Sequence, residues 1–171
     1  MAETTNKADQ KTIRETAERL VALLLSHGLS IATAESCTGG LLAGALTDVS
    51  GVSACFPGGI VSYANRIKNG MLGVPNEILD TVGAVSSECG AAMAKGVRKH
   101  FGVSVGLSTT GIAGPTGATE TKPVGLVYVT VSTPDETRVT RNVFQGDRDA
   151  VRRQSVLKAL QLAIDILTED Q

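Results

Sequence analysis

The sequence is poor in aromatic side chains and in histidine. Phe, Trp and Tyr together make up 3% of the 171 residues, and there are two histidines. So few aromatic rings exclude the base-stacking surfaces of RNA-recognition modules and of single-strand binding grooves. The formal net charge of -1 likewise leaves no basic excess to attract nucleic acid. We therefore expect a small-molecule partner and no nucleic-acid partner.

Paired cysteines and long apolar runs are also missing. Cys37, Cys55 and Cys89 form an odd set without the spacing of a zinc site or a disulfide framework, which fits a reducing cytoplasm. The first residues, MAETTNKADQ, lack the basic and apolar segments of a signal peptide. No apolar run reaches the roughly 18 residues of a membrane span. We expect a cytoplasmic protein that needs no metal, cofactor or membrane.

The length suits one domain, which we place over residues 11–169 after a flexible leader over residues 1–10. Apolar spacing predicts helices over residues 11–28, 38–49, 65–72, 75–82, 86–102 and 147–167. Short apolar runs predict strands over residues 29–35, 60–64, 103–111, 124–133 and 137–146. Because strands and helices alternate, we predict a single-domain three-layer α/β/α sandwich. Its mixed, mostly parallel sheet of about five strands ends in a C-terminal antiparallel hairpin.

Two predicted strands end in hydroxyl and glycine residues, TAESCTGG (33–40) and STTGIAGPTG (108–117). In open α/β sheets, ligands bind beyond the carboxyl ends of the strands, where helix N-termini present free N–H groups. If the two strands are neighbours, one pocket would contain Ser36, Thr38, Gly39, Thr110 and Gly111. Ordinary caps and tight turns are the alternative. The glycines fit neither the P-loop nor the dinucleotide pattern, so a nucleoside triphosphatase is disfavoured, whereas a single bound phosphate stays open.

A serine nucleophile needs a base, and histidine does not supply one. His27 and His100 lie at predicted helix ends near glycines, where an imidazole caps carbonyl groups. Ser36 also lacks the G-x-S-x-G elbow of the α/β-hydrolases. A lysine remains as the base, and the segment VSYANRIK places Tyr63 at the mouth of a strand and Lys68 on the short helix that follows. Such a lysine acts as a base only if its pKa is lowered, and a solvated lysine is the alternative.

Cys37 and the start of the last helix are two further candidate sites. Cys37 is the competing nucleophile if a helix N-terminus activates its thiol, and a small buried filler otherwise. In the segment GDRDAVRRQ, Asp147 is the expected N-cap of the last helix, and Arg148 beside it could clamp a phosphate or carboxylate. We expect Arg152 and Arg153 to be solvated or paired with Asp149.

Five segments together closely resemble the CinA C-terminal domain family, the nicotinamide-nucleotide amidases. They are AESCTGG, VSYANRIKNGMLGV, GAVS, GIAGPTGATETKPVG and GDRDAVRRQ, and the resemblance covers residues 12–167. It implies a fold like that of anticodon-binding domains and a homo-oligomer, with a dimer favoured. Larger members carry an additional domain that resembles molybdopterin-binding proteins, and we do not transfer its pyrophosphatase activity to this sequence.

The resemblance implies hydrolysis of nicotinamide mononucleotide to nicotinate mononucleotide and ammonia, in pyridine-nucleotide salvage. It implies that Ser36 is the nucleophile, Lys68 the general base and Tyr63 a residue that orients them. The residues it implies for substrate binding are Cys37, Thr38, Gly39, Thr110, Gly111 and Arg148. Arg66 departs from the acidic or small residue of relatives and is expected to alter affinity. A non-catalytic nucleotide-binding module, linked to competence or DNA damage, is the alternative.

Overall fold

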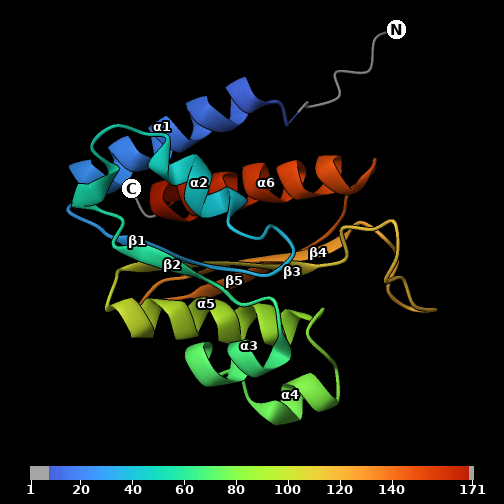
Figure 1. Ribbon diagram of the computed structural model, residues 1–171. Helices are drawn as coiled ribbons and strands as arrows, with labels where there is room; N and C mark the ends of the chain where they lie inside the picture. Colours follow the sequence, from blue (N-terminus) through green and yellow to red (C-terminus); the bar gives the residue numbers. More distant parts are fainter. Residues whose placement is uncertain (1–7, 170–171) are drawn as a thin grey trace, which may run out of the picture.

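A five-stranded mixed sheet forms the centre of the computed structural model, which describes residues 8–169 (Figure 1). Its strands are β1 (Ile31–Glu35), β2 (Gly58–Val61), β3 (Val105–Gly111), β4 (Leu126–Ser132) and β5 (Thr137–Val143). They lie in the order β2-β1-β3-β4-β5, with β2, β1 and β3 parallel and β4 and β5 antiparallel to their neighbours. The predicted mixed sheet and hairpin are confirmed. Residues 1–7 of the expected leader lie outside the described residues.

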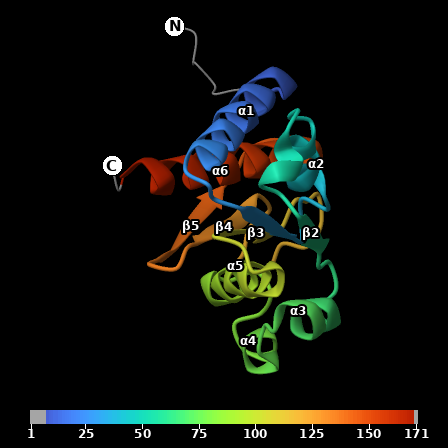
Figure 2. The same ribbon diagram turned by 90° about the vertical axis from the view of Figure 1, so that its left-hand side faces the viewer.

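Helices cover both faces of this sheet. They are α1 (Gln10–Ser26), α2 (Leu41–Thr47), α3 (Asn65–Leu72), α4 (Asn76–Asp80), α5 (Ser87–Phe101) and α6 (Arg148–Glu169), with a short 3-10 helix η1 (Val52–Ala54). Figures 1 and 2 show α1, α2 and α6 on one face and α3, α4 and α5 on the other. An apolar cluster fills the space on each face. The three-layer α/β/α architecture is therefore as predicted. No helix within residues 8–169 is long and apolar enough to cross a membrane.

The strand β1 lies between β2 and β3, and all five of its residues are buried. Successive side chains of a strand point to opposite faces. Ile31 accordingly packs in the cluster beneath α1 and α6, whereas Ala32 and Ala34 pack in the cluster beneath α5. Because β1, β2 and β3 are parallel, their carboxyl ends meet at one edge of the sheet. That edge is where the two hydroxyl and glycine segments come together.

Local capping sets the ends of the long helices. The Thr12 N–H donates to Asp9 Oδ1 at 2.8 Å at the start of α1, and the Cys89 N–H donates to Ser86 Oγ at 3.1 Å at the start of α5. His27 is the C-cap residue of α1, with Nδ1 2.9 Å from the Leu23 carbonyl oxygen. The predicted capping role of His27 is confirmed.

The helix predicted over residues 38–49 begins later, at Leu41. Gly39 and Gly40 have φ of 58° and 105°, left-handed values that a right-handed helix does not contain. The two glycines therefore form the turn from β1 into α2. This turn leaves residues 36–40 as an irregular segment, the 36–40 loop, at the carboxyl end of β1.

The close packing of α3 on α5 leads to a prediction about stability. A Cβ atom at Gly96 of α5 would overlap the carbonyl oxygen of Leu72 at the end of α3. We expect Gly96→Ala to lower the free energy of unfolding by about 1–3 kcal/mol, the usual cost of overpacking. Gly70→Ala is the control, because a Cβ there meets no atom within 4 Å. It should raise stability by about 0.5–1 kcal/mol. Urea unfolding followed by circular dichroism measures both, and equal effects would contradict the packing.

Candidate active site

Ser36 and Lys68 meet at the carboxyl end of β1. Ser36 directly follows β1, and its N–H donates to the Thr109 carbonyl oxygen at 3.0 Å, which continues the pairing with β3. The alternation of Ala32 and Ala34 therefore places the Ser36 side chain on the face covered by α3 and α5. Lys68 reaches it from α3, with Nζ 3.1 Å from Ser36 Oγ. The structure thus brings the two predicted residues into contact.

The Lys68 amine is buried and surrounded by neutral groups. The residue is 1% exposed, and Nζ donates to the carbonyl oxygens of Ser62 at 2.8 Å and Tyr63 at 3.1 Å. Within residues 8–169, no carboxylate forms an ion pair with it. Burial lowers the pKa of Lys68 because the charged form loses its hydration, while the nearby Cys89 and Cys37 thiols raise it to a smaller extent. The neutral amine is therefore more accessible here than in an exposed lysine.

A neutral lysine amine has two N–H groups and one lone pair. The carbonyl oxygens of Ser62 and Tyr63 are acceptors only, so they take the two N–H groups. The third neighbour of Nζ is the Ser36 hydroxyl, which can donate. The lone pair is then left for the Ser36 proton, which is the arrangement of a general base and its nucleophile.

Cys37 faces away from this pair. Its side chain is 5% exposed and packs in the apolar cluster on the α1 and α6 face, one residue out of phase with Ser36. Burial is the main cause that raises the pKa of the Cys37 thiol to about 12. The group is a protonated thiol near neutral pH, and a thiol reacts far less readily than a thiolate. Burial therefore argues against Cys37 as the nucleophile.

Glu35 holds the 36–40 loop against α2, a role that sequence reasoning missed. The side chain is 1% exposed. Its Oε1 accepts from the Thr38 hydroxyl at 2.6 Å and the Leu42 N–H at 2.8 Å, and its Oε2 accepts from the Ala43 N–H at 3.0 Å. An acidic residue just before a glycine turn and a short helix is the sequence signal for such a cap. The carboxylate is occupied by these donors and does not pair with Lys68.

The loop residues expected to bind substrate have their side chains turned inward. Thr38 is fully buried, and its Oγ1 lies 2.7 Å from Thr109 Oγ1. The Gly39 N–H donates to the Ser36 carbonyl oxygen at 3.1 Å. In the described part of the chain, the N–H groups of Thr38 and Gly40 have no acceptor. The loop can therefore offer main-chain donors to a ligand.

Thr110 and Gly111 lie at the end of β3, beside β4. Thr110 is 1% exposed, and its hydroxyl donates to the Ala84 carbonyl oxygen at 2.7 Å. Gly111 pairs with Val127 of β4. The Thr110 hydroxyl thus ties the segment GAVS to the sheet, and it makes no hydrogen bond to Ser36 or Lys68.

Tyr63 and Arg148 join three segments at the same edge of the sheet. The Tyr63 side chain is 63% exposed, and its hydroxyl accepts from Arg148 Nη2 at 3.3 Å. Arg148 Nη1 donates to the Gly114 carbonyl oxygen at 2.9 Å, in the loop between β3 and β4. Asp147 caps α6 as predicted, because its Oδ1 accepts the Ala150 N–H at 2.8 Å. Tyr63 meets Lys68 through its carbonyl group, while its phenol meets Arg148.

The prediction for Arg152 was wrong. Its Nε donates to the Cys37 carbonyl oxygen at 3.1 Å, and its Nη2 donates to the Thr38 carbonyl oxygen at 3.0 Å. Arg153 does pair with Asp149, as predicted. Residues four apart share one face of a helix, so Arg148 and Arg152 reach the site from the same side of α6. Sequence reasoning missed Arg152 because its partners are carbonyl groups, which no side-chain pattern reveals.

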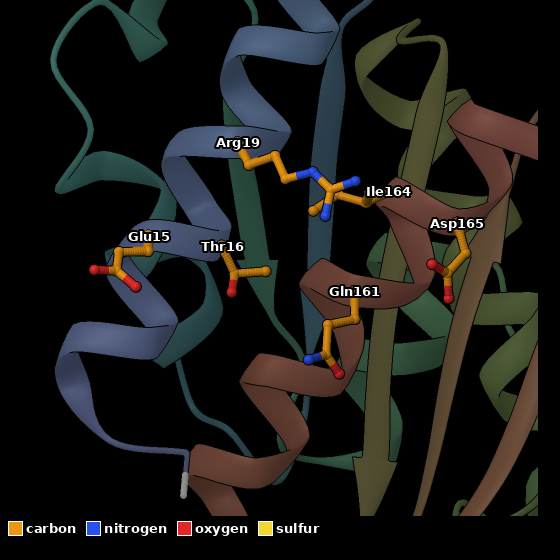
Figure 3. A pocket seen from close by; sticks show the side chains of 6 residues that line it. All are labelled: Glu15, Thr16, Arg19, Gln161, Ile164 and Asp165. Carbon is orange, nitrogen blue, oxygen red and sulfur yellow. The ribbon is translucent and has the colours of Figure 1, made fainter. Parts of the chain in front are cut away.

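Two surface hollows lie apart from the Ser36 and Lys68 pair. Figure 3 shows the smaller, of about 230 Å³, between Glu15, Thr16 and Arg19 of α1 and Gln161, Ile164 and Asp165 of α6. The larger, of about 900 Å³, lies between the start of α1, α2 and the start of α6. Neither lining includes Ser36, Lys68 or Tyr63. Residues 8–169 also hold no group of three or more His, Cys, Asp or Glu side chains suited to a metal ion.

Comparison with known proteins gives one consistent result. The family model for the CinA C-terminal domain matches residues 13–167. A competence-damage inducible protein of Thermoanaerobacter sp. (strain X514) is 51% identical over 86% of this chain, and a CinA-like protein of Acidobacterium capsulatum is 47% identical over 86%. The chain spans about a third of the length of these curated relatives, 36% of each.

Solved structures agree with the family match. The competence/damage inducible protein of Agrobacterium tumefaciens superposes with a TM-score of 0.89 at 39% identity, over 91% of this chain and 95% of that one. A CinA-superfamily protein of Klebsiella pneumoniae has a TM-score of 0.89 at 31% identity, over 92% of this chain and 98% of that one. The fold is thus that of the CinA-superfamily structures.

The Glu35 cap leads to a prediction about the site's stability. Glu35→Gln replaces a buried carboxylate by an amide whose NH₂ group cannot accept the donors of α2. We expect it to lower the free energy of unfolding by about 1.5–3 kcal/mol, the range for hydrogen bonds to a charged group. The matched control is Glu15→Gln, because Glu15 is exposed and 3.8 Å from Lys11. It should change stability by less than about 0.5 kcal/mol. Guanidinium unfolding measures the stability of both variants. A Glu35→Gln variant as stable as the wild type would contradict the capping role.

Proposed function

We propose that this chain, which belongs to the CinA C-terminal domain family, is an amidohydrolase that cleaves the carboxamide of nicotinamide mononucleotide to give nicotinate mononucleotide and ammonia. One observation carries the proposal. The buried Lys68 amine lies 3.1 Å from Ser36 Oγ, and it has no carboxylate partner in the described chain. Burying a lysine is costly, and a module that only binds a nucleotide has no need of this pair.

The proposed reaction has two steps. Lys68 takes the Ser36 proton as Oγ attacks the amide carbon, and the carbonyl oxygen becomes an oxyanion. The intermediate collapses, Lys68 returns the proton to the amide nitrogen, and ammonia leaves an ester on Ser36. Water then attacks this ester with Lys68 again as the base, which releases the carboxylate and restores the serine hydroxyl. No redox partner is needed, because each step only moves protons and exchanges acyl bonds.

The 36–40 loop is our candidate for binding the oxyanion. Main-chain N–H groups that are already oriented stabilise the developing charge in acyl transfer. Within this loop, the Gly39 N–H is already bonded to the Ser36 carbonyl oxygen at 3.1 Å. The N–H groups of Thr38 and Gly40 have no acceptor in residues 8–169, and Gly40 is partly exposed whereas Thr38 is fully buried, so the Gly40 N–H is the better candidate. The Thr38 side chain is buried away from the substrate.

We assign the phosphate of the substrate to Arg148. Its guanidinium lies at the N-terminus of α6, where the helix dipole also attracts an anion. Two of its N–H groups hold Gly114 and Tyr63, and an Arg side chain has five. The remaining donors can bind a phosphate at the mouth formed with Tyr63. Contacts with the phosphate, which is far from the scissile amide of the substrate, would supply binding energy rather than take part in the chemical step.

Ammonia release from nicotinamide mononucleotide by the purified protein is the direct test. We expect Ser36→Ala to lose turnover by at least about 10³-fold, because the nucleophile is removed. The matched control is Cys37→Ala, the neighbouring residue on the other face, which should keep most of the activity. If Cys37→Ala were inactive and Ser36→Ala active, Cys37 would be the nucleophile and the reaction would pass through a thioester. Binding of the nucleotide without ammonia release would favour a nucleotide-binding module.

The lowered pKa of Lys68 predicts a pH dependence. Only the neutral amine can accept the serine proton, so kcat should rise with pH through the pKa of Lys68 and fall away below it. Because burial lowers this pKa, the inflection should lie below the usual lysine value of about 10.4. Lys68→Arg should lose the inflection and at least about 10²-fold in kcat, since a guanidinium stays protonated. Near wild-type turnover in Lys68→Arg would place the base elsewhere.

A further inference from the structure

We infer that Arg152 is a positioning residue that fixes the main chain of the 36–40 loop beside Ser36. The inference rests on the proposed function. Arg152 donates from Nε to the Cys37 carbonyl oxygen at 3.1 Å and from Nη2 to the Thr38 carbonyl oxygen at 3.0 Å. It makes no hydrogen bond to the side chains of Ser36 or Lys68 within the described residues, so it acts through the main chain of the loop.

Peptide geometry converts these two contacts into a direction for the N–H groups. In a trans peptide unit, the C=O and N–H bonds point in opposite directions. Arg152 draws the Cys37 carbonyl toward α6, so the Thr38 N–H of the same unit points away from α6. The next unit shows the same effect, because its carbonyl is bound by Arg152 and its Gly39 N–H points back to the Ser36 carbonyl oxygen at 3.1 Å. Arg152 therefore fixes the orientation of the two peptide units that follow Cys37 and Thr38.

The charge of Arg152 adds to its geometry. A cation bound to a carbonyl oxygen polarises the peptide group and strengthens the donor at its other end. The rigid guanidinium fork serves two successive carbonyls at once, which a single ammonium group cannot do as well. Gly39 permits this close approach, because a Cβ there would lie 3.3 Å from Arg152 Nη2.

The loop is thus held by two charged groups of opposite sign. Glu35 accepts the first N–H groups of α2 on one side, and Arg152 donates to two loop carbonyls on the other. A loop fixed in this way loses little freedom when the oxyanion forms, which is how a preorganised site lowers the barrier. The expected consequence of losing Arg152 is a fall in kcat, with KM little changed.

The test compares Arg152→Ala with Arg153→Ala, because Arg153 is the neighbouring arginine of α6 and pairs only with the exposed Asp149. We expect Arg152→Ala to lower kcat by about 10- to 100-fold, somewhat less than deleting an oxyanion donor, and to leave KM within about threefold. Arg152→Lys should retain part of the lost rate. Millimolar guanidinium chloride, against sodium chloride as the control, should restore part of kcat in Arg152→Ala. Arg153→Ala should match the wild type.

Labelling of Ser36 by an alkyl fluorophosphonate, followed by mass spectrometry, gives a readout independent of nicotinamide mononucleotide. The phosphonyl oxygen needs the same N–H donors, so Arg152→Ala should label more slowly while its melting temperature stays above the assay temperature. If the wild type releases ammonia and Arg152→Ala equals Arg153→Ala in both assays, the inference is wrong and the proposed function stands. The inference would also be wrong if the loss of kcat in Arg152→Ala were no larger than its unfolded fraction accounts for. If the wild type is neither active nor labelled, the proposed function fails and the inference fails with it.

Discussion

The burial of the Lys68 amine without a carboxylate partner is the constraint on which the site depends. An ammonium group in this position has lost its hydration and has no anionic partner in the described chain, so the pKa of Lys68 is lowered. The Ser62 and Tyr63 carbonyl oxygens accept N–H groups of the amine, and in the neutral form this leaves the lone pair for Ser36. An acidic partner for Lys68 would have raised the pKa again and removed the base. The buried carboxylate of Glu35, the residue before Ser36, instead accepts hydrogen bonds from α2 and Thr38.

The alternation of a single strand separates the reactive groups of the TAESCTGG segment. Ser36 shares a face with Ala32 and Ala34, beneath α3 and α5, whereas Cys37 packs on the opposite face beneath α1 and α6. The serine thereby meets the Lys68 amine, whereas the thiol is buried among apolar side chains, which raises its pKa. Two helices on opposite faces therefore serve one site. The helix α3 supplies the lysine, and α6 supplies the arginines that hold the surrounding loops.

Every residue of the proposed site lies within residues 13–167, which the CinA C-terminal domain model matches. The names of the relatives refer to competence and damage, and they do not describe a reaction. Hydrolysis is supported by the contact of Ser36 with Lys68, by the lowered pKa of the lysine and by the unpaired Gly40 N–H in the described chain. The chain covers about a third of each curated relative, so what the rest of those proteins does is a separate question.

The sequence by itself determined the α/β class, the Asp147 cap of α6 and the candidacy of Ser36 and Lys68, because these follow from apolar spacing and local motifs. It could not determine the start of α2, since the left-handed backbone of Gly39 and Gly40 is set by the turn they make. Only the tertiary structure decided that Lys68 is buried, that Glu35 caps α2 and that Arg152 holds the 36–40 loop. The physical reason is the same in each case. Desolvation and contacts with main-chain carbonyl and N–H groups depend on which segments meet in space, and those groups are identical at nearly every position of a sequence.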